Sequence, residues 1–176
     1  CSGVDSRVAE PDLYAGGGFT NAGGMIANRV ARWDGSGWSG LGTGMNAIVR
    51  TVVVQGSDLY AGGDFTAAGV SAANHIAKWD GANWSVLGIG TDNAVRSISI
   101  NGNDLYACGN FETAGGAPAR GIAQWDGANW SSLGSGVNRA ARAVAAATGK
   151  IYTGGDFDSA GGKSSFHFGI WRPHYY

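Results

Sequence analysis

Residues 49 to 88 read VRTVVVQGSDLYAGGDFTAAGVSAANHIAKWDGANWSVLG, and this stretch recurs almost four times in a chain of 176 residues. Tyrosines and tryptophans mark equivalent positions of the copies: Tyr14, Tyr60, Tyr106 and Tyr152, then Trp33, Trp79, Trp125 and Trp171. Each step is 46 residues long, without insertion or deletion. A fixed period of this size predicts a repeat architecture in which neighbouring units stack on one another.

One unit predicts four short strands: Val49 to Gln55, Leu59 to Phe65, His75 to Trp79, and Trp84 to Leu87. The first is a β-branched, apolar run, and the third alternates polar with apolar residues, as strands do. Thr66 to Asn74, rich in Ala and Gly, predicts a loop. The pair Gly62-Gly63 inside the second strand indicates that another backbone or a bulky side chain comes close there.

The unit resembles the kelch-type β-propeller blade. The matching features are an apolar strand followed by a glycine pair, the element WDGANWSVL, and an arginine at the start of the next inner strand. The unit is similar above all to the bacterial and fungal cell-surface pattern LYxGGxFTxAGG…IAxWDGxxWxxLG. The resemblance covers nearly the whole chain. It implies an all-β propeller of four-stranded antiparallel blades, a fold that serves many unrelated functions.

We therefore expect residues 1–176 to form a single β-propeller domain of four repeats, approximately 1–46, 47–92, 93–138 and 139–176, the last of them truncated. Two arrangements of the ring stay open. Four blades of one chain close a ring by themselves, or two chains together close a larger one, which would make the protein a homo-oligomer.

Composition excludes several classes of partner. The formal net charge is −1 and only 14% of the residues are charged, without a basic stripe or an amphipathic helix. We therefore expect no binding to nucleic acid and no charge-driven binding to membrane surfaces. No apolar run approaches the ~18 residues that span a bilayer. Few lysines, together with the resemblance, favour an extracellular, cell-surface or envelope location.

The two cysteines have different interpretations. Cys1 stands either at a fragment or processing boundary, or at the mature terminus of a bacterial lipoprotein, where Cys1 would carry the lipid anchor. Cys108 replaces a glycine that the other repeats have at Gly16, Gly62 and Gly154, which predicts a small buried filler.

The repeated tryptophans and aspartates favour structural roles. Trp rings stack on sugars, but these lie at repeat-invariant strand ends beside tight turns, so packing between units is the preferred interpretation. Asp34, Asp80 and Asp126 each stand alone in a Trp-Asp-Gly turn, without the several oxygen ligands that a calcium loop supplies. We expect turn-closing aspartates and no metal site.

The repeated arginines Arg50, Arg96 and Arg142 are candidate binding residues. They begin the predicted inner strands, which line the central channel of a propeller. A partial ring of guanidinium groups suits a carboxylate or another anion. The alternative is that each arginine pairs with a neighbouring carbonyl or aspartate and fixes the spacing of the blades.

Catalysis has little support in the sequence. The three histidines are scattered, and no nucleophile elbow, metal-ligand cluster or phosphate loop is present, so we expect neither an enzyme nor a cofactor. The favoured function is a non-catalytic protein-interaction module, a subunit or docking platform of a larger assembly. The alternative is a carbohydrate-binding, lectin-like propeller that takes a glycan. A propeller hydrolase or lyase with a site built from loops is third.

The fourth unit is the expected contact with a protein partner. The loops between the second and third strands diverge most among the repeats, and loops are where a packed repeat specialises. In the fourth unit this loop ends at Phe166, and the aromatic residues Trp171, Tyr175 and Tyr176 follow. Aromatic side chains are typical anchors of protein interfaces. We therefore predict that these four residues contact a neighbouring chain.

Overall fold

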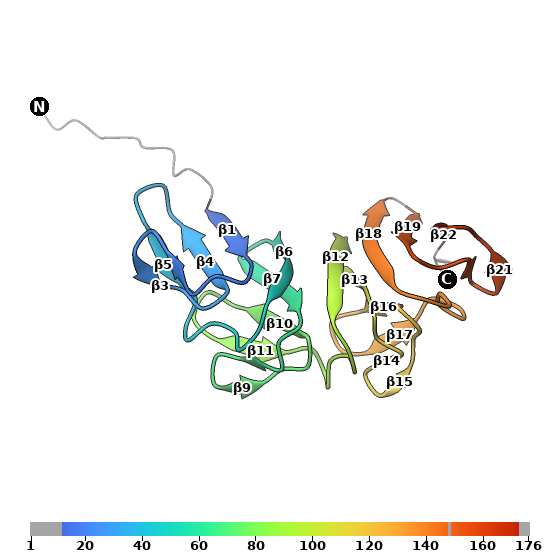
Figure 1. Cartoon of the computed structure of the whole chain (residues 1–176), viewed down its shortest axis with the longest axis horizontal. Coiled ribbons are helices and arrows are strands. Elements are labelled where there is room, and N and C mark those ends of the chain that lie inside the picture. Colours follow the sequence, from blue (N-terminus) through green and yellow to red (C-terminus); the bar gives the residue numbers. More distant parts are fainter. Residues whose placement is uncertain (1–11, 148, 173–176) are drawn as a thin grey trace, which may run out of the picture.

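The computed structural model describes residues 12–147 and 149–172, and within these ranges every regular element is a β-strand. Each repeat forms one antiparallel sheet, and the four sheets follow one another in chain order across the molecule (Figure 1). The described residues form an open array, with the first and last sheets at its two ends, and a closed propeller ring is not seen in them.

The sheets share one strand order. The first contains β1 (Leu13–Gly16), β4 (Val30–Trp33) and β5 (Trp38–Gly40). The second contains β6 (Val49–Gln55), β7 (Asp58–Gly63), β10 (Ile76–Trp79) and β11 (Trp84–Val86). The third contains β12 (Val95–Asn101), β13 (Asp104–Gly109), β16 (Ile122–Trp125) and β17 (Trp130–Ser132). The fourth contains β18 (Ala141–Ala147), β19 (Lys150–Gly155) and β22 (Phe168–Trp171).

Most predicted strands are confirmed, and the predicted loop is wrong in one respect. β6 has the bounds expected from the sequence, whereas residues 66–74 contain the hairpin of β8 (Ala67–Ala68) and β9 (Ser71–Ala72). The other units have the same hairpin, formed by β2 (Asn21–Ala22) and β3 (Met25–Ile26), β14 (Thr113–Ala114) and β15 (Ala117–Pro118), and β20 (Ser159–Ala160) and β21 (Lys163–Ser164). Strands of two residues are too short to show an alternating pattern, so periodicity cannot detect them.

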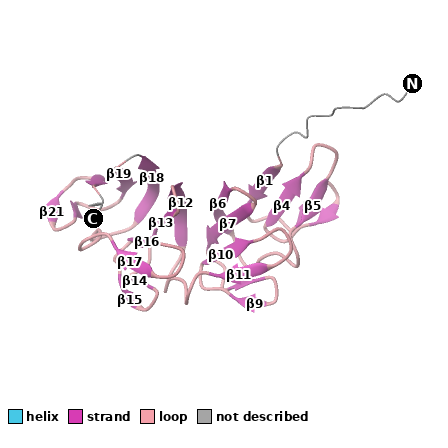
Figure 2. Cartoon of the chain, turned by 180° about the vertical axis from the view of Figure 1, so that it is seen from behind, coloured by secondary structure: helices cyan, strands magenta, loops and turns pink. Residues whose placement is uncertain are grey.

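The strands β6, β12 and β18 lie toward the middle of the array and are called the inner strands, while β11 and β17 form the opposite edges of their sheets (Figures 1 and 2). Hydroxyl groups join the inner strands to one another. The Ile98 amide donates to Thr51 Oγ1 at 3.3 Å, and the Ala146 amide donates to Ser99 Oγ at 2.9 Å. These bonds satisfy amide groups on the inner edge of each sheet, which no backbone ladder reaches.

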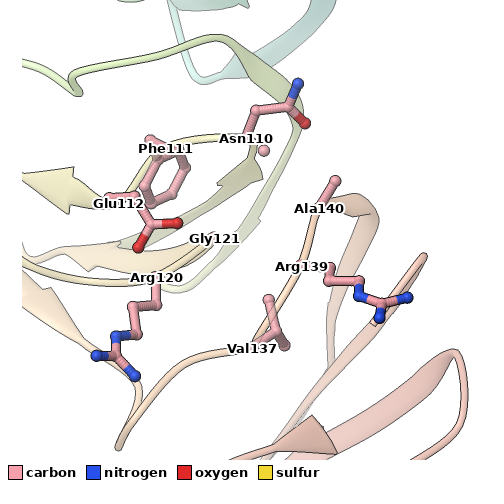
Figure 3. A pocket seen from close by; sticks show the side chains of 9 residues that line it. Asn110, Phe111, Glu112, Arg120, Gly121, Val137, Arg139 and Ala140 are labelled. Atoms are coloured by element: carbon pink, nitrogen blue, oxygen red, sulfur yellow. The ribbon is translucent and has the colours of Figure 1, made fainter. Parts of the chain in front are cut away.

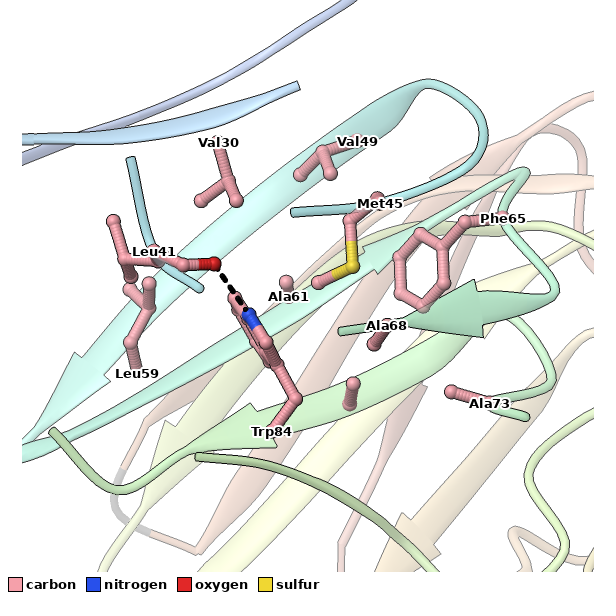
Figure 4. Close-up of a cluster of buried hydrophobic side chains, with 11 residues drawn as sticks. Val30, Leu41, Met45, Val49, Leu59, Ala61, Phe65, Ala68, Ala73 and Trp84 are labelled. Atoms are coloured by element: carbon pink, nitrogen blue, oxygen red, sulfur yellow. Dashed lines mark hydrogen bonds between the residues drawn. The ribbon is translucent and has the colours of Figure 1, made fainter. Parts of the chain in front are cut away.

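Tryptophans connect each unit to the one before it. Trp84 Nε1 donates to the carbonyl oxygen of Leu41 at 2.9 Å, and Trp130 Nε1 repeats this bond to Leu87 at 2.8 Å. Trp84 lies in a core cluster with Val30, Leu41 and Met45 of the first unit and with side chains of the second (Figure 4). The predicted role of the Trp residues in packing between units is confirmed.

In the first two units the first glycine of the pair receives a side chain of the next unit, and the second glycine of Gly62-Gly63 lets a neighbouring segment of its own unit come close. A Cβ atom on Gly62 would lie 2.6 Å from Val95 Cγ1, and one on Gly63 would lie 2.1 Å from the carbonyl oxygen of Ile48. Gly16 meets Val49 of the second unit in the same way, at 2.6 Å. The close approach predicted from the Gly62-Gly63 pair is confirmed.

Where the third unit packs against the fourth, a larger residue replaces the glycine and a smaller residue replaces the valine. Cys108 takes the place of the glycine, and Ala141 takes the place of the valine. Both are fully buried and belong to one core cluster with Val144 and Ile151. Burial raises the pKa of the Cys108 thiol to about 12, so it stays protonated and inert at neutral pH. The prediction of a small buried filler is confirmed.

This exchange predicts a strongly coupled pair. Gly62→Cys alone should lower the free energy of unfolding by about 1–3 kcal/mol, because the Cβ of the new side chain would lie 2.6 Å from Val95 Cγ1 and 2.9 Å from Thr51 Cγ2. Val95→Ala alone should cost about 2 kcal/mol through the cavity that it leaves. The double variant copies Cys108 and Ala141 and should cost about 1 kcal/mol less than the sum of the single losses. Chemical denaturation of the four proteins measures the coupling, and additive losses would contradict this account.

Candidate functional site

The repeated aspartates close turns, as predicted. Oδ1 of Asp80 accepts the amides of Ala82 and Asn83 at 2.8 and 2.7 Å, and Asp126 repeats the arrangement. Hydrogen bonds from Ser36 lower the pKa of Asp34 to about 2. In the part of the chain that the structure describes, no group of three or more His, Cys, Asp or Glu side chains is placed to hold a metal ion.

Two of the three candidate arginines are held by a carboxylate of their own hairpin. Arg50 Nε and Nη2 donate to the two Asp64 oxygens at 2.6 and 2.7 Å. Arg142 forms the same bidentate pair, in which its Nε and Nη2 donate to Asp156 Oδ1 and Oδ2 at 2.8 and 2.6 Å. Each pair joins the first two strands of one sheet, and the hydrogen bonds from the arginine lower the pKa of its aspartate.

Arg96 has a neutral partner instead. Its Nε donates to Asn110 Oδ1 at 2.8 Å, because Asn110 stands where the other units have Asp64 and Asp156. The positive charge of Arg96 also contributes to the lowered pKa of both aspartates. The three arginines therefore share one electrostatic neighbourhood, and the middle one carries the least compensated charge.

A second repeated position holds a strained backbone. Arg29, His75, Gly121 and His167 are equivalent in the repeat, and their φ values are 67°, 65°, 76° and 62°. His75 was predicted to begin a strand, but this left-handed conformation keeps it outside β10. The Nδ1 atom of His75 is buried without a hydrogen-bond partner among the described residues, whereas His167 Nδ1 lies 3.0 Å from the carbonyl oxygen of Gly155.

Gly121 has no side chain to place there, and a pocket of about 250 Å³ lies at this position of the third unit (Figure 3). Its lining includes four residues that differ in charge or size from their counterparts in the other units: Asn110, Glu112, Arg120 and Arg139. Phe111 and Val137 form buried walls. Sequence reasoning missed this site, although the signal was present as a cluster of departures from the repeat around the junction of the third and fourth units.

The fourth unit exposes apolar side chains. Phe166 is 77% exposed, and Phe168 and Ile170 on β22 are 52% and 53% exposed. Trp171, also predicted to contact a partner, is half-buried and packs against the core cluster of the third and fourth units, and its contact with a partner stays a prediction. The predicted contacts Tyr175 and Tyr176 and the lipid-attachment candidate Cys1 lie outside the described residues.

Comparison of the sequence with protein-family models and with curated proteins found no match. Among the described residues, no helix is long and apolar enough to cross a membrane.

The ion pair of the second unit should make stability depend on pH. Asp64→Asn removes the carboxylate that holds Arg50 and should cost about 0.5–1 kcal/mol at pH 7, the range of a partly exposed pair. Because folding lowers the pKa of Asp64, its contribution is complete above ~3.9, the unfolded value, and is lost as pH falls through the folded value. The gap between variant and parent should therefore close below that pH.

Urea denaturation at pH 7 and at pH 2.5 tests this expectation. Asn110→Asp is the matched control, since it supplies Arg96 with the carboxylate of the other units and should raise stability at pH 7 only. A gap for Asp64→Asn that stays the same at both pH values would show that the carboxylate is not what stabilises the hairpin.

Proposed function

We propose that the chain is a non-catalytic protein-interaction module, whose repeat units are blades of a kelch-like β-propeller and whose contact surface is the open face of the last unit. The observation that carries this proposal is the exposure of a side chain that every other unit buries. The resemblance and the few lysines support a place at the cell surface or envelope.

The strands equivalent to β22 bury their first residue under the next unit. Val30, Ile76 and Ile122 are all fully buried, each in a core cluster that includes side chains of the following unit. Phe168 has the same repeat position and is 52% exposed. The trailing face of the fourth unit therefore presents the chemistry of an inter-unit contact without a unit packed against it among the described residues.

The leading face of the first unit is open in the complementary way. Leu59, Leu105 and Ile151 are buried where their units meet the preceding one. Leu13 has the same repeat position and is 57% exposed. The two ends of the array thus expose the two halves of the contact that joins consecutive units inside the chain.

A contact whose two halves differ is heterologous, and copies that repeat it form a ring or a filament. The occupant that best fits the trailing face is therefore the leading face of a second copy of this chain. Two copies joined at both ends would close a ring of eight blades. This is the two-chain arrangement that the sequence left open.

The fourth unit also has apolar residues at positions where the other units have polar ones, as is typical of an interface. Phe166 stands where the other units have Asn28, Asn74 and Arg120. Ile170 stands where they have Arg32, Lys78 and Gln124. Replacement of polar by large apolar residues, around a strand whose outer edge is unpaired among the described residues, is a costly arrangement in a monomer and a favourable one in a contact.

Charge reversal of this face tests the proposal. Size-exclusion chromatography with light scattering should show a dimer of the parent protein that dissociates on dilution. Phe168→Glu and Leu13→Glu should each weaken association at least tenfold, because a carboxylate would be buried without a partner. Val70→Glu is the matched control, since Val70 is 97% exposed on a hairpin of the second unit and should leave association unchanged. A strict monomer at all concentrations would overturn the proposed contact.

A further inference from the structure

We infer that the third unit carries a binding site for a small ligand, namely a planar ring of imidazole size that bears a carboxylate. This site is separate from the face of the fourth unit and does not depend on how copies associate. The inference is drawn from what the other three units place at the same position.

Three units fill this position with a side chain of their own. The imidazole of His75 has a buried Nδ1, and His167 Nδ1 lies 3.0 Å from the carbonyl oxygen of Gly155, the residue before Asp156. In the first unit Arg29 Nη1 reaches the carbonyl oxygen of Met45 at 3.5 Å. Only the third unit has a glycine, and there the pocket of about 250 Å³ lies beside Asn110, the counterpart of Asp64 and Asp156 (Figure 3).

The backbone is already set for an occupant of this kind. Gly121 has φ of 76°, close to the 65° of His75 and the 62° of His167, so the third unit keeps the conformation without the imidazole. A ring of that size would lie against Phe111 and Val137, with the Asn110 amide at its edge. The rigid surroundings reduce the ordering cost that a binding site otherwise requires.

The charges around the pocket define what the ring should carry. Arg120 replaces Asn28, Asn74 or Phe166 of the other units, and Arg139 replaces Ala47 or Asn93. Both side chains are exposed. The Nη2 atom of Arg139 lies 3.6 Å from Asp158 Oδ2, a long distance for an ion pair. Among the described residues no carboxylate lies within ion-pair distance of Arg120. In Figure 3 the two guanidinium groups leave opposite sides of the pocket and point away from its centre. Because both side chains are long and exposed, each can turn toward an anionic group held at the pocket mouth, which favours a carboxylate on the ligand.

Glu112 adds a negative charge to a pocket whose other charged residues are arginines. It stands where the first two units have Thr20 and Thr66, and its carboxylate lies on the same wall as Arg120 (Figure 3). A carboxylate accepts a hydrogen bond from a ring N–H, so the pocket offers complementary groups to both ends of a ring that carries an acid. A simple anion such as phosphate would use the arginines, but it would leave the apolar walls unfilled and meet the negative charge of Glu112.

Titration of the full chain with 4-imidazoleacetate, imidazole, acetate and inorganic phosphate tests the inference, with binding followed by amide chemical shifts in ¹⁵N NMR spectra. Imidazoleacetate should shift the amides of Gly121, Phe111 and Arg139 saturably. It should bind at least about tenfold more tightly than imidazole or acetate, the effect of one added charge-assisted contact. Equal binding of all four probes, binding of phosphate alone, or no binding of imidazoleacetate would overturn it.

Two variants separate the ring from the carboxylate. A Cβ on Gly121 would lie 2.7 Å from Val137 Cγ2, so Gly121→His is combined with Val137→Ala, which removes that methyl group and keeps the wall apolar. This double variant should abolish binding by filling the pocket. Arg139→Asn, which copies Asn93, leaves the packing untouched and should reduce imidazoleacetate affinity to that of imidazole. Unchanged affinity in Arg139→Asn would overturn the assignment even if the double variant failed to fold.

Discussion

The structure depends on one contact, in which the backbone of a glycine in one sheet receives a β-branched side chain from the next. Gly16 receives Val49, and Gly62 receives Val95. Because the fit leaves no room for a single methyl group, the distance between consecutive sheets is fixed at these points. The tryptophan bonds of Trp84 and Trp130 then hold the outer strands at a constant spacing from the preceding unit. An insertion within one of these strands would move the contacts out of register.

Much of this arrangement could be predicted from the sequence because the repeat supplies the same information several times. The bounds of β6, the close approach at Gly62-Gly63 and the buried role of Cys108 all follow from residue types that only one environment accommodates. Elements without a distinctive pattern could not be predicted. The two-residue hairpins are held by turn geometry and by bridges such as that of Met45 to Ala68, and both depend on a neighbouring segment that local periodicity does not include.

The candidate sites show a different limit. The sequence predicted both roles of the arginines, and the structure shows Arg50 and Arg142 paired with aspartates fourteen residues further on. Residues fourteen positions apart meet because the beginning and the end of the hairpin lie side by side at its open end. The pairing can therefore be predicted only once the register of β6 with β7 is known. The pocket beside Gly121 was harder to foresee, because a missing side chain leaves no motif. It becomes visible only when the left-handed backbone of His75 and His167 shows that their side chains share one position.

Positions at which one unit has a different residue from the others are informative. Because all the units share one backbone conformation, the fold itself explains few of these differences. Around the junction of the third and fourth units the departures Asn110, Glu112, Arg120 and Arg139 are polar and lie around one pocket, which is how a site for a small polar molecule differs from its surroundings. In the fourth unit the departures Phe166 and Ile170 are apolar and exposed, which is how an interface differs from a solvated surface. Both changes leave the glycine contacts and the strand order intact. Residues that do not pack against the next unit can therefore change without disturbing the stacked sheets. The pocket and the exposed apolar face use different residues, so the two kinds of recognition can arise independently in one chain.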